Sequence, residues 1–261
     1  MPTLDALYYY PIKSIAGITL DETSISPLGL PHDRAWMVSD LDGRLVTGRE
    51  HPELVQVHAE VGVGTLTLRA PGLPELVVDL AQFEQAHPAS VWKDNFSAWA
   101  GAAAADDWFS QYLGRPVRLL ATNDTQRRVR SAPDVPLSFA DGYPLLLIGE
   151  ASRRELSDWV GRDLAMARFR PNLVINDAPA FAEDGWKRIR IGDVILRIAK
   201  PCGRCVFTTV DPVTAQKSAD QEPLRTLAKR RKGPEGAEFG QNVIAETSGV
   251  LRVGMPVEIL E

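Results

Sequence analysis

The stretch KPCGRCVFTTVDP, residues 200–212, carries the most information in the chain because it sets two cysteines, Cys202 and Cys205, three positions apart. In a thioredoxin-like site the first cysteine of such a pair opens a helix. The β-branched run at 206–210 predicts a strand instead, which disfavours dithiol exchange. A structural zinc site needs four ligands, and the sequence has no second Cys-x-x-Cys to supply them. The histidines lie far upstream without paired spacing, which also disfavours zinc: His32, His51, His58 and His87.

Two interpretations of the cysteine pair remain open. Gly203 makes a thiol accessible, and the cations of Lys200 and Arg204 favour its thiolate, so one cysteine can act as a nucleophile or a soft-metal ligand. Alternatively, both cysteines are inert core residues, since free cysteine often simply packs. Two thiols cannot build a four-cysteine iron–sulfur cluster, so electrons for a redox reaction must come from another protein.

The composition is that of a globular chain. Of its 261 residues, 44% are hydrophobic and 24% are charged, which excludes general disorder. The net charge of −5 excludes sequence-blind nucleic-acid binding by the chain as a whole, and we expect the basic runs at 127–130 and 229–233 to be solvated loops. Apolar runs fall far short of the roughly 20 residues of a membrane-spanning helix, and the N-terminus shows no secretory signal. We therefore expect no membrane span and a cytoplasmic location.

Short β-branched or alternating runs recur along the chain and predict a mainly β fold with a few helices, an α+β class built from many short antiparallel strands. Gly192-Asp193 is placed as a hairpin turn between two such runs. Helical spacing occurs at 103–113, 151–160 and 223–231. A domain boundary is expected at 115/116, after the first helix. The predicted strands are 4–10, 35–39, 54–61, 65–69, 76–78, 117–121, 145–148, 173–175, 194–198, 206–210 and 257–260.

Three cations stand where a loop meets a strand. Lys13 lies in YPIKS (10–14), Arg34 in HDRAW (32–36) and Arg170 in FRPN (169–172). Backbone donors and a guanidinium at such a junction can together hold a phosphate or carboxylate. Taken singly, each is a weak signal, and a plain surface or salt-bridge role is the more common one.

The order of these motifs, continued by IGD (191–193), CGRCVFTTVDP (202–212) and FGQN (239–242), resembles the MOSC-domain proteins, in the branch that contains the mitochondrial amidoxime-reducing component. The resemblance extends from Tyr8 to about Ile259. It implies an N-terminal MOSC-associated β-barrel region, residues 1–115, packed on a MOSC β-barrel domain, residues 116–261.

The resemblance also implies a molybdenum cofactor, a pterin whose dithiolene binds the metal, with Cys205 as the protein ligand and catalytic residue. Cys202 has no role in this scheme and is expected to pack. Asn242 stands where the family can place a tyrosine, so that contact departs from the pattern. The other implied cofactor-binding residues are Lys13, Ser14, Arg34 and Arg170 for the pterin and its phosphate, Gly203 and Arg204 beside the metal, and Gly142 and Tyr143 in a contacting loop.

The function implied is molybdenum-dependent reduction of N-hydroxylated compounds (hydroxylamines, amidoximes and N-hydroxylated bases) to the amine or amidine. The expected partners are a small N-hydroxylated substrate and an external electron-donor protein, a flavin reductase with a haem or iron–sulfur carrier. The alternative is a non-catalytic cofactor carrier or a sulfur-relay protein with a persulfide on Cys205. Gly62-Val63-Gly64 lacks the third glycine and the helix of a dinucleotide site. We expect neither NAD or FAD nor pyridoxal phosphate, and no nucleic acid.

Overall fold

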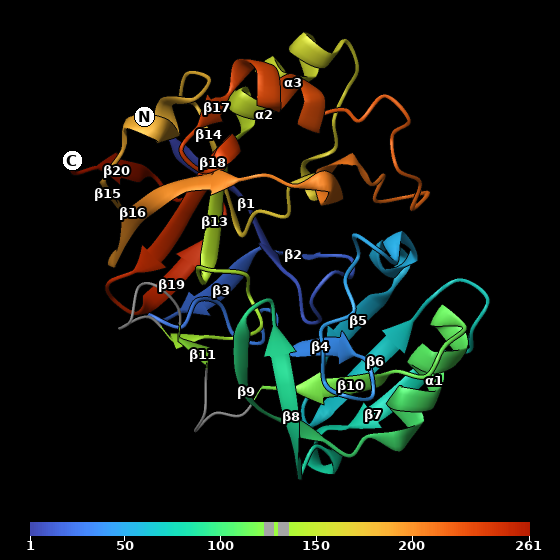
Figure 1. The fold of residues 1–261 in the computed structure, drawn as a ribbon. Coiled ribbons are helices and arrows are strands. Elements are labelled where there is room, and N and C mark those ends of the chain that lie inside the picture. Colours follow the sequence, from blue (N-terminus) through green and yellow to red (C-terminus); the bar gives the residue numbers. More distant parts are fainter. Residues whose placement is uncertain (123–127, 130–135) are drawn as a thin grey trace.

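The fold is mainly β, as predicted, with helices on its outside (Figure 1). It is known from a computed structural model that describes residues 1–122, 128–129 and 136–261. Both ends of the chain lie near each other, at one side of the larger sheet (Figure 1). The hydrogen bond from Leu4 N to Met255 O, 2.9 Å long, ties the two ends together.

The larger sheet has nine strands within the described residues, in the order β2-β1-β14-β13-β18-β16-β15-β20, with β17 beside β18. Apolar side chains such as Leu7, Leu147 and Leu196 are fully buried against one of its faces. The predicted hairpin at Gly192-Asp193 is confirmed, because it joins β15 to β16. The strands are β1 (Thr3–Tyr9), β2 (Ile18–Leu20), β13 (Leu145–Gly149), β14 (Leu173–Asn176), β15 (Arg188–Ile191), β16 (Val194–Gly203), β17 (Lys232–Gly233), β18 (Gly236–Ala245) and β20 (Val257–Ile259).

The second half of the molecule holds a four-stranded sheet and a three-stranded sheet with a separate core. Helix α1 (Ala103–Leu113) packs its buried Trp108 and Phe109 into that core and ends at Gly114, whose φ of 65° is left-handed. The sheets are formed by β4 (Trp36–Ser39), β10 (Arg118–Ala121), β9 (Asp94–Ala100) and β8 (Gln85–Val91), and by β5 (His58–Val61), β6 (Thr65–Arg69) and β7 (Leu76–Asp79).

The first strands of the chain pair with strands from its C-terminal part. Strand β1 pairs with β14, and β3 (Glu22–Ile25) pairs with β19 (Gly249–Arg252). The chain therefore begins in the larger sheet before it forms the four-stranded and three-stranded sheets. The division into 1–115 and 116–261 therefore stays a proposal. A further short pair joins β11 (Arg128–Val129) to β12 (Pro136–Leu137).

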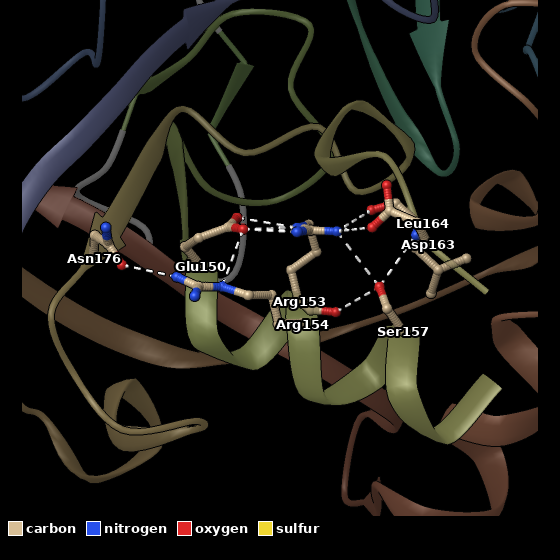
Figure 2. Close-up of polar contacts among 7 residues, drawn as sticks. All are labelled: Glu150, Arg153, Arg154, Ser157, Asp163, Leu164 and Asn176. Carbon is tan, nitrogen blue, oxygen red and sulfur yellow. Dashed lines mark hydrogen bonds and ion pairs between the residues drawn. The ribbon is translucent and has the colours of Figure 1, made fainter. Parts of the chain in front are cut away.

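Helix α2 (Glu150–Val160) is held by a network of polar contacts (Figure 2). Arg153 donates to Glu150, to Asp163 Oδ1 at 2.6 Å and to the carbonyl oxygen of Leu164 at 3.0 Å. Ser157 Oγ accepts from Leu164 N at 3.1 Å. These bonds fix the chain that leaves α2 and leads into the short 3₁₀ helix η3 (Met166–Arg168).

Three sequence-based expectations are wrong in detail. The run 206–210 is not a strand but the 3₁₀ helix η5 (Val206–Thr209), because the hydroxyls of Thr208 and Thr209 bond back to the carbonyls of Cys205 (2.9 Å) and Val206 (2.7 Å). The start of the predicted strand 54–61 is the 3₁₀ helix η1 (Pro52–Gln56), opened by a proline at its first turn. Strands β13 and β14 pair in parallel. The remaining helices are α3 (Leu224–Arg230), which agrees with the prediction, and the 3₁₀ helices η2 (Leu80–Gln82) and η4 (Ala182–Gly185).

Candidate functional site

One cavity of about 260 Å³ brings together every residue that the sequence placed in a site. The loops after β1 and β4, the segments that lead into β13 and β14, and the end of β16 meet there, although they are far apart in sequence. The predicted residues in its lining are Lys13, Ser14, Arg34, Gly142, Tyr143, Arg170, Gly203, Arg204, Cys205 and Asn242.

Both cysteines line this cavity and both are partly exposed. Cys202 lies in β16, and Cys205 directly precedes η5. The cations expected beside Cys205 are used elsewhere, which corrects the sequence-based interpretation. Lys200 Nζ pairs with Glu235 at 2.9 Å, and Arg204 Nη1 lies 3.1 Å from the sulfur of Cys202. Cys202 thus contributes to the cavity wall as well as packing against the core.

Gly203 is the residue that allows β16 to pass close to the β17–β18 turn. A Cβ built at this position lies well inside 3.0 Å of the carbonyl oxygen of Glu235 and 3.3 Å from its carbonyl carbon. The neighbouring Arg204 N bonds to Ala237 O at 2.6 Å, which holds the two segments at this separation. A side chain at 203 would force them apart and move the cysteines on either side.

Tyr10 is a fully buried ring between two arginines. The guanidinium carbon of Arg34 lies 4.4 Å from the ring centroid, and that of Arg170 lies 4.1 Å from it. The hydroxyl donates to Pro171 O at 3.0 Å, and Tyr10 N donates to Asp33 Oδ1 at 2.8 Å. Burial raises the pKa of Tyr10 well above its usual value, although the two arginines act against that rise. The Tyr10 ring is therefore uncharged, and its contacts with both guanidinium groups help to hold Arg34 and Arg170 in the cavity wall.

Arg170 has a donor without an acceptor. Its Nη1 donates to the carbonyl oxygen of Ile15, but its buried Nη2 has no hydrogen-bond partner among the described residues, 1–122, 128–129 and 136–261. Burial lowers the pKa of Arg170 to about 10. Arg204 Nε is likewise buried without a partner. Buried donors of this kind are costly unless an acceptor meets them, so the cavity wall is suited to an anion.

The backbone is left-handed at four non-glycine residues of the cavity wall within the described part of the chain: Trp92, treated below, and three of the predicted site residues. The φ angles are 74° at Ser14, 51° at Arg34 and 57° at Arg170. Each such non-glycine residue costs on the order of 1–3 kcal/mol, and residues of this kind cluster at functional sites. Contacts around them hold the conformation, for example the bonds from Gly48 N to Ser14 Oγ (3.1 Å) and from Arg34 Nη2 to Arg170 O (3.2 Å).

Sequence reasoning missed a second group of cavity residues. Asp141 Oδ1 accepts from Lys13 Nζ and from Trp92 Nε1, each at 2.7 Å, and the guanidinium of Arg49 lies 4.2 Å from the Trp92 ring centroid. Trp92 is 41% exposed and has a φ of 57°. An aromatic residue next to Lys93 at a hairpin tip was the available signal in the sequence, although it does not point to a partner.

The remaining predicted residues also line the cavity. Asn242 Nδ2 donates to Pro201 O at 3.1 Å, and Lys200 Nζ lies 5.8 Å from the Tyr143 ring centroid. Gly142 has open space where a Cβ would stand, with nothing within 4 Å.

Comparison with known proteins matches residues 1–116 to the MOSC N-terminal beta barrel domain and residues 134–258 to the MOSC domain. Mitochondrial amidoxime-reducing component 1 of Homo sapiens is 31% identical over 280 residues, which cover 99% of this chain and 83% of that protein. The Danio rerio protein of the same name is 33% identical, with 96% and 82% covered. The chain belongs to the MOSC-domain family of amidoxime-reducing components.

Other members are similarly related. Mitochondrial amidoxime reducing component 2 of Bos taurus is 31% identical to this MOSC-domain chain, with 98% of the chain and 82% of that protein covered. Among solved structures, the YUAD protein from Bacillus subtilis aligns with 99% of the chain and 95% of its own at 11% identity and a TM-score of 0.44, which is too distant to bear on function.

The MOSC cavity fits the molybdenum cofactor that the family implies. The unpartnered donors of Arg170 and Arg204 suit the phosphate of a pterin, and Cys205 offers a thiol to a metal that prefers sulfur. Among the residues that the structure describes, no three His, Cys, Asp or Glu side chains gather as a metal site.

The basic run at 229–233 is not the loop that the sequence predicted, because residues 229–230 end α3 and residues 232–233 form β17, and none of the five lines the MOSC cavity. In the run at 229–233, the guanidinium of Arg230 lies 5.0 Å from the Trp159 ring centroid, and Arg231 pairs with Asp184. In the run at 127–130, Arg127 and Arg130 lie outside the described residues. Within the described part of the chain, no helix is both long and apolar enough to cross a membrane.

Proposed function

We propose that this chain is a molybdenum-cofactor-dependent reductase that converts N-hydroxylated compounds (hydroxylamines, amidoximes or N-hydroxylated bases) to the amine or amidine. The observation that carries the proposal is the joint presence, in one cavity, of the accessible thiol of Cys205 and the unpartnered buried donor of Arg170. Relatives with more than four fifths of their length matched are named amidoxime-reducing components, which supports the same reaction class.

The chain's residues have separate tasks in this proposal. Arg170, Arg34, Lys13 and Ser14 bind the pterin and its phosphate, because they form the cation-rich wall on the Tyr10 side of the cavity. Cys205 provides the metal's protein ligand. Gly203 and Arg204 shape the wall next to it, and Gly142, Tyr143 and Asn242 complete the lining.

When bound, the molybdenum centre supplies the two-electron chemistry that breaks the N–O bond. The protein orients the substrate in the cavity, and no side chain is assigned as a general acid. Since two cysteines cannot hold an iron–sulfur cluster, we propose that electrons come from an external flavin reductase with a haem or iron–sulfur carrier. A cytoplasmic location stays a prediction, since the relatives' names are mitochondrial.

The test is elemental and pterin analysis of protein made in a host that synthesises the cofactor, together with reduction of hydroxylamine and an amidoxime by a viologen dye. We expect about one molybdenum per chain and turnover of both substrates. Cys205→Ser should abolish turnover and change the molybdenum spectrum, whereas the matched Cys202→Ser variant should keep both. Equal loss in both variants would mean that the ligand is wrongly assigned.

Other outcomes separate the alternatives. Bound cofactor without turnover under any reductant would identify a cofactor carrier. Sulfane sulfur on Cys205 without molybdenum would identify a sulfur relay. Protein from a competent host that carries neither molybdenum nor pterin would refute the proposal altogether.

A further inference from the structure

The segment Arg168-Phe169-Arg170 runs alongside the loop Cys205–Asp211, which we call the cysteine loop. Arg168 Nη1 donates to Val210 O at 2.9 Å and to Thr209 O at 3.2 Å, and its Nη2 pairs with Asp211 Oδ2 at 2.6 Å. The Arg168 side chain is only 9% exposed. One guanidinium therefore holds three consecutive residues at the far end of the cysteine loop.

The next two residues hold the near end and the middle of the same loop. Phe169 O accepts from Arg204 Nη2 at 2.6 Å, directly before Cys205. The guanidinium of Arg170 lies 5.6 Å from the ring centroid of Phe207. The segment 168–170, which carries the unpartnered Arg170 donor, therefore contacts the cysteine loop at its start, in its middle and at its end.

The far end of the cysteine loop is built to receive Arg168. Asp211 Oδ1 accepts from the backbone N–H groups of Val213 and Thr214, each at 3.0 Å, which leaves Oδ2 for the guanidinium. On the other side of the loop, Ser218 N donates to Thr209 O at 2.9 Å. Hydrogen bonds from a charged group to carbonyl and carboxylate oxygens are about twice as strong as neutral ones, and a guanidinium fixes direction as well as distance.

We infer that Arg168 is a positioning residue, which fixes the backbone of the cysteine loop and thereby the place of the Cys205 sulfur relative to Arg170. The inference rests on the proposed function for its purpose, since a metal bound by one thiolate and a phosphate bound by Arg170 require a fixed separation between the two groups. The contacts of Arg168 with the cysteine loop involve only this chain, so their effect on the loop can be measured without cofactor.

The test follows alkylation of Cys205 by iodoacetamide in full-length protein made in a host without the cofactor. Trypsin cleaves after Arg204, so Cys202 and Cys205 fall on separate peptides. Mass spectrometry can therefore measure the alkylation rate of each cysteine in one sample. We expect Arg168→Met to accelerate alkylation of Cys205 roughly fivefold or more, because charge-assisted bonds that close the loop are lost. Arg168→Lys should recover part of the protection, since it keeps the charge but not the fork.

The matched control is Arg162→Met. Arg162 also pairs with a carboxylate, Asp220 (3.0 Å), and reaches Ser218 Oγ at 3.3 Å. Within the described residues it makes no direct hydrogen bond to the cysteine loop, and the backbone bond from Ser218 N to Thr209 O does not involve the Arg162 side chain. We expect this variant to leave the rate at Cys205 unchanged. The rate at Cys202 serves as an internal reference and should stay constant in all variants.

Several results would overturn the inference. A folded Arg168→Met protein with an unchanged Cys205 rate would do so, and so would equal acceleration at Cys202 or in Arg162→Met, since that indicates general loosening. If Arg168→Met does not fold, Asp211→Asn removes the ion pair alone and must accelerate Cys205 in the same direction. The alkylation test needs no metal, so it can be interpreted even if the protein proves to have no reductase activity. Conversely, an unchanged alkylation rate would contradict the role of Arg168 without contradicting the reductase proposal.

Discussion

Replacing Gly203 by alanine tests whether the close approach of β16 to the β17–β18 turn fixes the cavity wall. The added methyl would lie well inside 3.0 Å of Glu235 O, and the atom it meets is backbone, which cannot rotate away as a side chain could. Overpacking of this kind costs about 1–3 kcal/mol. Separating the strands also weakens the bond from Arg204 N to Ala237 O, which contributes about 1 kcal/mol.

We therefore expect Gly203→Ala to lower the free energy of unfolding by about 2–4 kcal/mol, from these two contributions together. The assay is urea unfolding followed by tryptophan fluorescence, with molybdenum content measured on the same preparations. The matched control is Gly142→Ala, in the same cavity wall, where a Cβ meets nothing within 4 Å and we expect no loss of stability. The reasoning is refuted if Gly203→Ala is as stable as the wild type, or if the two variants lose the same amount.

Three further predictions concern buried polar groups. Tyr10→Leu should lower the free energy of unfolding by about 2–4 kcal/mol, because both arginine contacts and packing volume are lost. Tyr10→Phe should lower it by about 1 kcal/mol, because only one hydrogen bond is lost. Equal losses for the two variants in urea unfolding would contradict this. Inorganic pyrophosphate should raise the melting temperature of cofactor-free wild type but not of Arg170→Met, and an equal rise in both would place the anion elsewhere. Glu183 accepts hydrogen bonds from Gly149 N and Ser152 Oγ, and its burial raises its pKa above the ordinary value of 4.5. At pH values just above 4.5 the native state therefore binds more protons than the unfolded chain. The wild type should therefore gain stability relative to Glu183→Gln as pH falls from 7 towards 4.5, and a constant difference would disprove that.

The sequence predicts what is local and contiguous. Lys13, Arg34, Arg170 and Cys205 stand in short motifs whose order identifies the family, so the structure gathers residues that the motifs had already named. Asp141 and Trp92 carry no such pattern, because their meeting with Lys13 arises only when three loops fold together.

Two differences from the predicted strands show where local strand propensity fails: β8 and β9 are strands that the sequence did not predict, and the run 206–210 was predicted but is not a strand. Strands β8 and β9 contain poor strand formers, such as Pro88 and Asp94, and form because they pair with each other. Conversely, the β-branched run after Cys205 bends into a 3₁₀ turn, since two threonine hydroxyls compete for the backbone carbonyls.

The pairing of β1 with β14 has a consequence for how the chain is made. On the ribosome, β1 emerges before the other described strands, and its partner β14 follows more than 160 residues later. At about 5–20 residues per second, that delay is roughly 10–30 s. During this time β2, Ile25 and Leu30 can cover part of β1, but its other edge lacks β14, and Leu4 and Leu7 lack the core residues of the later strands. A chaperone that shields extended apolar segments would find a long-lived target in β1 of the nascent chain.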